Sequence, residues 1–318
     1  MLLLGIFLLL SACAHRQDAP FVPADASVAS VRELVETPFF PQRKYQCGPA
    51  SLATLLTVHG VEASPDSLQP LVYIPDQKGS LQAEMLTAPA RFGLLGVRLP
   101  PGLDSLLAEI SAGRPVLVLQ NLGKQVLPIW HYAVATGYDL GKNEIYLRSG
   151  ADRRRIYRIS AFLESWQKSG YWAMVVVPPD RIPVSAQPQE YLRAASALER
   201  LGDFSKARTA YQAATQRWPD SVPAWGGVGN TAFALGDFGA AEQAYHAALA
   251  VDPGSVLIMN NLAMTLSRKG CRARALEVID CARLRQDLPL LHRTRTEISA
   301  TPGGQDSCAG FSCMAVTP

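Results

Sequence analysis

The sequence has almost no excess of charge of one sign. Lys and Arg number 30 and Asp and Glu number 27, which leaves a formal net charge of +3 over 318 residues. This balance argues against a nucleic-acid surface, because such surfaces gather Lys and Arg to meet the phosphates. We therefore expect no nucleic-acid partner.

The sequence also lacks the spacings of a metal site and an apolar run long enough to span a bilayer. Its cysteines and histidines show none of the paired spacings that zinc sites use, so we expect no metal, and we expect no cofactor. The uncharged apolar run at residues 2–12 is far shorter than the roughly 20 residues that a membrane-spanning helix needs.

That apolar run ends in Leu10-Ser11-Ala12-Cys13, which resembles a bacterial lipobox. The resemblance implies a signal peptide over residues 1–12, lipidation of Cys13 and a lipid anchor in a membrane. Ala14 rather than Asp follows the cysteine, which favours the outer membrane of the cell envelope, facing the periplasm. An ordinary secretory signal with a chance cysteine is the alternative. No Lys or Arg precedes the run, so the true translation start stays open.

Length and composition indicate an ordinary globular protein of two domains. Prolines at 178, 179, 183 and 188 mark the connection between them. From the changes of pattern we expect a tether over 13–30, a first domain over 31–180, a linker over 181–190, helical repeats over 191–286 and a loosely ordered tail over 287–318.

The first domain mixes helix and strand patterns. Helices are predicted after Cys47, over 103–110 and over 162–166, and strands over 116–120, 131–138, 144–148, 155–159 and 172–177. Helices toward the N-terminal end with most strands after them predict an α+β fold.

Cys47 lies where an extended segment gives way to a helical pattern. The start of a helix offers unpaired N–H groups and a positive dipole end, so we expect a nucleophilic thiol with a lowered pKa. His131 opens a strand pattern far along the chain, as expected for the base that serves a thiol. A buried structural cysteine is the alternative for Cys47.

The ordered motifs Gln42, Cys47 to Ser51, His131 to Val134 and Gly137 to Asp139 resemble those of C39-like bacterial cysteine peptidases, which have a papain fold and are of the double-glycine type. The resemblance covers residues 35–178. It implies a papain-like domain that cleaves a peptide bond, with Cys47 as nucleophile, His131 as base and Gln42 as a donor to the oxyanion.

The residue that orients the histidine departs from the family pattern. The family usually has Asp or Asn after the next strand, where this chain has Arg148 or Ser149. Three interpretations stay open: a Cys–His dyad in which Ser149 stands at the third position, a carboxylate supplied by Asp139 or Asp152, and loss of catalysis.

A repeat of 34 residues begins after the linker. Gly202-Asp203-Phe204 recurs as Gly236-Asp237-Phe238 and, more weakly, at Gly270, where Cys271 replaces Asp. This period resembles the tetratricopeptide (TPR) repeat and implies an all-α domain of about two and a half to three repeats that binds a protein partner. So short an array is expected to dock on the first domain or on a partner.

Six cysteines must be assigned in an exported, oxidising setting. With Cys13 lipidated and Cys47 the nucleophile, four remain for disulfides: Cys271, Cys281, Cys308 and Cys313. Four cysteines allow three pairings, and the sequence does not choose among them.

Three functions remain open at this point. The first is a lipid-anchored, periplasm-facing cysteine peptidase whose repeats recruit a peptide or protein substrate or a protein partner. The second is a catalytically silent lipoprotein whose cleft binds a peptide during assembly. The third is a murein amidase-type hydrolase, which the repeats favour least.

Overall fold

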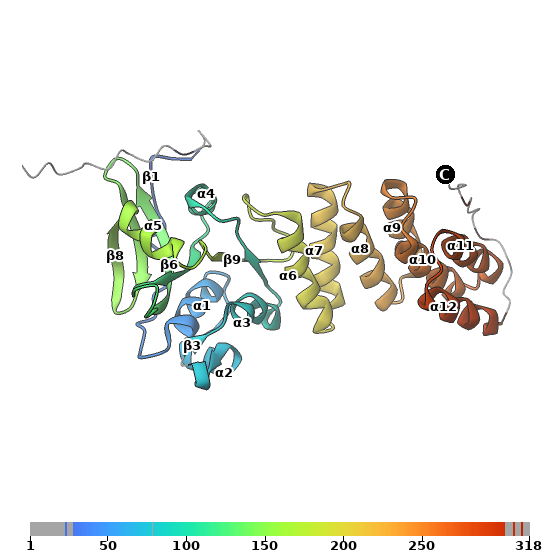
Figure 1. Cartoon of the computed structure of the whole chain (residues 1–318), viewed down its shortest axis with the longest axis horizontal. Helices are drawn as coiled ribbons and strands as arrows, with labels where there is room; N and C mark the ends of the chain where they lie inside the picture. Colours follow the sequence, from blue (N-terminus) through green and yellow to red (C-terminus); the bar gives the residue numbers. More distant parts are fainter. Residues whose placement is uncertain (1–22, 24–27, 78, 303–307, 309–312, 314–318) are drawn as a thin grey trace, which may run out of the picture.

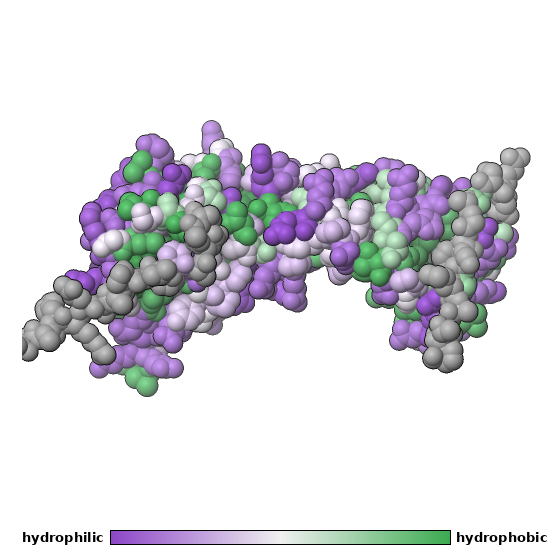
Figure 2. All heavy atoms as spheres, turned by 90° about the horizontal axis from the view of Figure 1, so that it is seen from above, coloured by the Kyte–Doolittle hydropathy of each residue, from purple (hydrophilic) through white to green (hydrophobic). Residues whose placement is uncertain are grey.

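The computed structural model describes residue 23, residues 28–77 and 79–302, and Cys308 and Cys313. The lipobox with Cys13 lies outside these residues. Figure 1 shows an α+β domain at one end of an elongated molecule, with a row of helices extending from it. Among the described residues no helix is long and apolar enough to cross a bilayer. The face in Figure 2 mixes hydrophilic side chains with separate hydrophobic patches.

A seven-stranded antiparallel sheet forms the centre of the first domain. Its order is β4-β9-β5-β6-β7-β8, and β1 pairs with the C-terminal end of β6. The strands are β1 (Val31–Glu33), β4 (Leu95–Arg98), β5 (Val116–Asn121), β6 (Trp130–Asp139), β7 (Glu144–Ser149), β8 (Asp152–Arg158) and β9 (Ala173–Val177). A separate ribbon consists of β2 (Tyr73–Ile74) and β3 (Gly79–Ser80).

Helices cover both faces of this sheet. On one face lie α1 (Cys47–Thr57), α2 (Pro65–Val72) and α3 (Gln82–Thr87), and on the other lie α4 (Leu103–Ser111) and α5 (Ile159–Gln167), with short 3-10 turns at Pro75–Gln77 and Ala88–Phe92. Side chains alternate along a strand, so Leu117 and Leu119 face α1 while Val116 and Val118 face the other layer. This explains why the first four residues of β5, Val116 to Leu119, are all apolar.

The second domain is all helical. Its helices are α6 (Pro188–Arg200), α7 (Phe204–Arg217), α8 (Val222–Ala234), α9 (Phe238–Val251), α10 (Val256–Arg268) and α11 (Arg272–Arg285). The predicted order of an α+β domain and an all-α repeat domain is therefore confirmed. Asp203 and Asp237 cap α7 and α9 by accepting hydrogen bonds from the N–H groups of Lys206 and Ala240.

The prediction of a loosely ordered tail is wrong for residues 289–300, which form α12 (Pro289–Ala300). Proline at its first position suits a helix start, and Leu291 and Ile298 are fully buried against the last repeat. The sequence does not reveal this helix because few of its positions are apolar, and most of the others are polar.

Two disulfides fasten the chain beyond α12 to the last repeat. Cys271 pairs with Cys308, and Cys281 pairs with Cys313, which decides among the three possible pairings. Cys271 stands where the earlier repeats carry their capping Asp, and it makes no side-chain cap. The third repeat thus has a covalent link in place of a helix cap.

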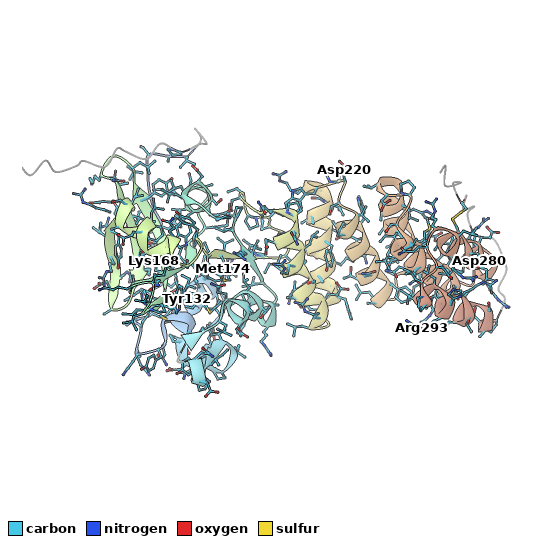
Figure 3. All side chains as sticks on the ribbon, in the orientation of Figure 1. Tyr132, Lys168, Met174, Asp220, Asp280 and Arg293 are labelled. Atoms are coloured by element: carbon cyan, nitrogen blue, oxygen red, sulfur yellow. A yellow bond between two sulfur atoms is a disulfide. The ribbon has the colours of Figure 1, made fainter. Side chains whose placement is uncertain are left out.

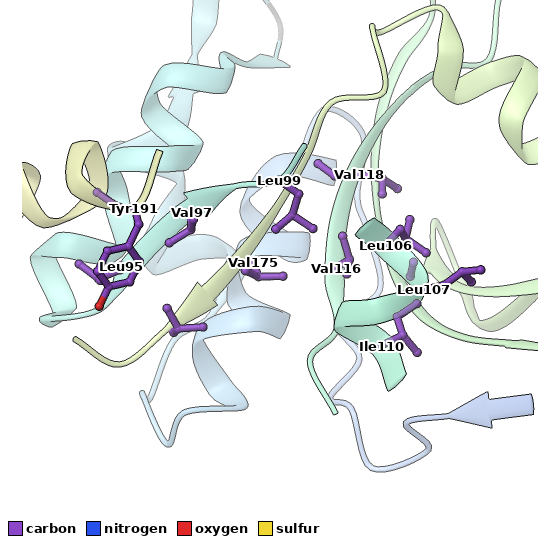
Figure 4. Close-up of a cluster of buried hydrophobic side chains, with 14 of the residues drawn as sticks. Leu95, Val97, Leu99, Leu106, Leu107, Ile110, Val116, Val118, Val175 and Tyr191 are labelled. Carbon is purple, nitrogen blue, oxygen red and sulfur yellow. The ribbon is translucent and has the colours of Figure 1, made fainter. Parts of the chain in front are cut away.

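The two domains share one hydrophobic core. Tyr191 of α6 is fully buried and packs beside Leu95 and Val97 of β4 (Figure 4). The linker is also held, because the buried carboxylate of Glu109 accepts hydrogen bonds from the N–H of Ser185 at 2.8 Å and from its hydroxyl at 2.6 Å. The expected docking of the repeats on the first domain is therefore observed.

This shared core predicts that a defect in α6 reaches the first domain. Tyr191→Ala should cost about 3–5 kcal/mol of unfolding free energy, the usual range for removing a buried aromatic side chain. It should also expose Cys47 to alkylation at a lower denaturant concentration. Tyr245→Ala is the matched control, because Tyr245 is equally buried but lies in the separate core of the later repeats. Equal protection of Cys47 in both variants would contradict a shared core.

Candidate active site

A cleft of about 1020 Å³ lies in the first domain. One wall comes from the β2–β3 ribbon and the start of α3, and the other from the ends of β5 and β6 that lie next to each other in the sheet. The cleft is lined by three of the predicted site residues, Gln42, Cys47 and His131. Residues far apart in the sequence therefore meet in one cleft.

Cys47 is the first residue of α1, as the sequence predicts. The next residue, Gly48, is buried against β3, where an added Cβ would come within 2.3 Å of Ser80 Oγ. Only glycine allows the helix start to approach the opposite wall so closely. Gln46 turns away from the cleft, because its Nε2 donates hydrogen bonds to Asp66 Oδ1 at 3.2 Å and to Gln69 Oε1 at 2.9 Å.

The environment of the thiol differs from the expectation. Burial raises the pKa of Cys47, and backbone hydrogen bonds at Tyr132, Gly48 and Cys47 itself lower it by a smaller amount. The prediction of a lowered pKa is therefore wrong: the helix start supplies polar contacts, but the loss of water around the sulfur outweighs them. The site therefore disfavours the thiolate.

His131 is the second residue of β6, and its ring is mostly buried. Burial lowers the pKa of His131, and the positive charge of Arg155 lowers it further. The ring nitrogen Nε2 lies 2.9 Å from Ser149 Oγ. If Nε2 carries the ring hydrogen and donates a hydrogen bond to Ser149 Oγ, then Nδ1 is the unprotonated nitrogen that can accept a proton. Both pKa shifts favour the neutral forms of the two side chains that share the cleft.

Among the candidates for the third residue, the structure brings Ser149 to the histidine. Asp139 lies at the opposite end of β6, where it pairs with Glu144 across the sheet. Its carboxylate accepts a hydrogen bond from the N–H of Lys142 at 3.0 Å and lies 3.3 Å from Lys142 Nζ, contacts that lower the pKa of Asp139. Asp139 is therefore too far along the strand to touch His131.

The two remaining candidates also point elsewhere. Arg148 is buried and donates hydrogen bonds to the carbonyls of Val35 and Thr37. Asp152 lies in β8 with an exposed side chain, 3.4 Å from Arg155. Both side chains are therefore engaged away from His131.

Gln42 lies between the helix and the strand that carry Cys47 and His131. Its Nε2 donates long hydrogen bonds to the carbonyl of Tyr132 at 3.2 Å and to Ser51 Oγ at 3.3 Å, and its Oε1 accepts one from the N–H of Gly150 at 3.1 Å. Gly150 has φ +62°, a turn conformation that glycine adopts freely. The amide donors of Gln42 thus face the cleft region but are engaged at rest.

Several lining residues had no signal in the sequence. Ser80 belongs to a two-residue strand that no pattern predicts, yet it contacts Gly48, and its backbone carbonyl accepts a hydrogen bond from the Tyr132 hydroxyl at 3.1 Å. Lys168 follows α5 and lines the same cleft as Tyr132. Figure 3 labels both side chains. Within the part of the chain that the structure describes, no group of three or more His, Cys, Asp or Glu could hold a metal ion.

Comparison with known proteins follows the same division of the chain. Residues 34–174 match the model of the peptidase C39-like family, and residues 192–256 and 227–282 match that of the tetratricopeptide repeat. The first domain thus matches the C39-like peptidase family model, and the helical domain matches that of the tetratricopeptide repeat, in the order that the sequence motifs predict. No match was found among curated proteins.

Solved structures of C39-like peptidases are similar to the first domain at low identity. A protein from Bacillus anthracis described as a C39-like peptidase is 16% identical, with a TM-score of 0.40, 46% of this chain covered and 97% of that one. The peptidase domain of Streptococcus ComA, a bifunctional ABC transporter of a quorum-sensing pathway, is 20% identical, with a TM-score of 0.38 and coverages of 45% and 99%. A double-glycine-motif protease from an AMS/PCAT transporter, solved with its leader peptide, is 17% identical, with a TM-score of 0.35 and coverages of 45% and 93%.

The burial of Cys47 in the C39-like domain predicts its pH dependence. Its alkylation by iodoacetamide should increase with pH to a midpoint above the ordinary thiol value of roughly 8.5, because the folded site disfavours the thiolate. The measurement uses a Cys13→Ser chain, so that Cys13 does not compete. The same chain unfolded in urea is the control and should show the ordinary midpoint. A folded midpoint below the unfolded one would show that a thiolate–imidazolium pair forms at rest.

Proposed function

We propose that this chain is a lipid-anchored, periplasm-facing cysteine peptidase that cleaves a peptide bond through Cys47 and His131. One observation carries the proposal. Cys47 is the free cysteine among those that the structure describes, and it shares a cleft with His131, whose ring is fixed by Ser149. Four other cysteines are paired, so an unpaired thiol in the cleft is an exception that a nucleophile explains.

The chemistry begins from the neutral pair. As the peptide enters, His131 Nδ1 takes the thiol proton and the sulfur attacks the carbonyl carbon, which gives a tetrahedral oxyanion. The backbone N–H of Cys47 and the amide of Gln42 are the proposed donors to that oxyanion. The imidazolium then returns the proton to the leaving amine, an acyl-enzyme remains, and water releases it with His131 as base.

A serine beside the base limits this mechanism. Ser149 Oγ can accept the Nε2 hydrogen and orient the ring, but it carries no charge to stabilise the imidazolium that forms during attack. This observation favours a second candidate function, a cleft that binds a peptide without cleaving it. The two functions differ in what a carboxylate at position 149 would do.

The predicted lipid anchor gives the location. Disulfides persist in oxidising compartments, so the pairs Cys271–Cys308 and Cys281–Cys313 support an exported protein. Lipidation of Cys13 would hold the chain at the membrane while leaving both domains in the periplasm. The repeats supply a surface for a protein partner or for the substrate itself.

Replacing the serine tests the mechanism. Ser149→Asp should increase the rate of Cys47 alkylation at neutral pH about tenfold or more, because a carboxylate next to a histidine raises its pKa by roughly one unit or more. Peptidase activity should increase with it, measured as new N-termini in a cell-envelope extract. Ser149→Asn is the size-matched control without charge. His131→Ala should abolish cleavage, and an extract unchanged by wild type, Ser149→Asp and Cys47→Ala alike would favour the binding function.

The anchor has its own test. A clickable fatty-acid probe fed to cells should label the wild-type chain and not Cys13→Ser, and the variant should appear in the soluble periplasmic fraction. Ser11→Ala, a change between two small residues in the same motif, is the control that should keep the label. Equal membrane retention of wild type and Cys13→Ser would overturn the lipoprotein assignment.

A further inference from the structure

Among the residues that the structure describes, the side chains that line the cleft include basic ones but no acidic ones. Arg43, Lys44 and Lys168 line it, and none of the lining residues described by the structure is Asp or Glu. Glu84 follows the lining residue Ala83 but is not itself part of the lining. Because the whole chain is nearly balanced at +3, this separation of charge is local to the cleft.

These cations are available to a ligand. Arg43 lies 3.6 Å from Asp66, and Lys168 lies 3.6 Å from Glu164, but in both pairs the carboxylate side chain is well exposed to water. Exposed ion pairs of this kind contribute about 0–1 kcal/mol and exchange partners easily. Lys44 has no carboxylate partner among the described residues. Lys168 also donates a hydrogen bond to the carbonyl of Gly123 at 3.2 Å, which does not neutralise its positive charge. An anionic group that enters the cleft would therefore find three cations that are held at most by exposed carboxylates or a neutral carbonyl.

A loop at the edge of the cleft presents apolar side chains to water. The rim loop, residues 122–129, joins β5 to β6, and its shape is set by Asn121, whose Oδ1 accepts hydrogen bonds from the N–H groups of Gly123 and Ile129, each at 2.9 Å. Lys124 and Leu127 form a further bridge within it. The loop is thus held in place by hydrogen bonds.

The rim loop and the residue after it face the cleft with large apolar groups. Pro128, Ile129 and Trp130 line the cleft, and the side chains of Ile129 and Trp130 are 61% and 51% exposed. Adjacent exposed apolar residues beside a cleft are typical of a surface that a ligand covers. Val126, at 83% exposure, belongs to the same loop but does not line the cleft.

We propose that the cleft selects a peptide segment that combines an acidic side chain with a large apolar one. The acidic group is held among Arg43, Lys44 and Lys168, and the apolar group packs on Ile129 and Trp130. This inference rests on the proposed peptidase function, since it names the substrate class of that site. The charge of the lining excludes basic peptides by repulsion, and the rim loop favours apolar peptides by burial.

The test measures binding without turnover, in the full-length Cys47→Ala chain, by fluorescence anisotropy. Dye-labelled Ala-Gly peptides of equal length carry Glu with Leu, Gln with Leu, Lys with Leu, or Glu with Ser. The Glu–Leu peptide should bind best, about fivefold or more over the Gln–Leu peptide and further over the Lys–Leu peptide. The advantage of Glu should shrink as salt is added, because exposed charges are screened.

Matched variants assign the two preferences to their residues. Arg43→Glu should remove or reverse the preference for Glu over Lys, whereas Arg181→Glu should not, although Arg181 is equally exposed and equally 3.6 Å from a carboxylate. Ile129→Ser should remove the preference for Leu over Ser, whereas Val126→Ser should not. Equal effects of a variant and its control would overturn the proposal.

The remaining outcomes separate this inference from the proposed function. Selective binding of the Glu–Leu peptide without cleavage by the wild type would keep the inference and reject the peptidase. Cleavage by the wild type with equal binding of Glu and Lys peptides would keep the peptidase and reject the inference. If Ile129→Ser instead weakens binding to vesicles of phosphatidylglycerol and leaves peptide binding unchanged, the rim loop is a membrane contact and the proposal fails.

Discussion

The packing of α1 against the sheet is the contact on which the candidate site depends. Leu52, Leu55 and Leu56 are buried against β5, β6 and β9, and their burial fixes the helix along the strands. With the helix fixed, its first residue, Cys47, is placed beside the start of β6, which carries His131. The thiol and the imidazole thus owe their place in one cleft to apolar contacts that begin more than one helical turn after Cys47.

The same burial sets the chemical character of the site. Partial burial raises the pKa of the thiol and lowers that of the imidazole, so the site favours the neutral form of each group. Charge then has to develop during the reaction, and each fixed dipole near the sulfur gains importance because burial limits the help that water can give. Ser149 carries no charge that could stabilise an imidazolium. This lack matters more beside a buried imidazole than it would beside one that water could solvate.

How far the sequence predicts this molecule depends on the range of the interactions. Local spacing of apolar residues predicts the helix at Cys47 and the strands β5 to β7. The recurrence of residues every 34 positions predicts the helical repeats. The meeting of Cys47, His131 and Gln42 in one cleft followed only from the family resemblance. Ser80 and Lys168 could not be predicted, because the ribbon and the end of α5 reach the cleft through tertiary packing. The thiol pKa was mispredicted because the local helix start is visible in sequence and burial is not.

The last consequence of the packing concerns the repeats. β4 is one edge of the sheet, and an open edge is a site of unwanted pairing, but here α6 packs beside it, with Tyr191 next to Leu95 and Val97. Glu109 holds the linker at Ser185, so the connection is also fixed by hydrogen bonds. A partner bound to the repeats would therefore be held in a defined position relative to the cleft. An array that protects a sheet edge and presents a binding surface at once has a structural reason to remain attached, because removing it would expose the core of the peptidase-like domain.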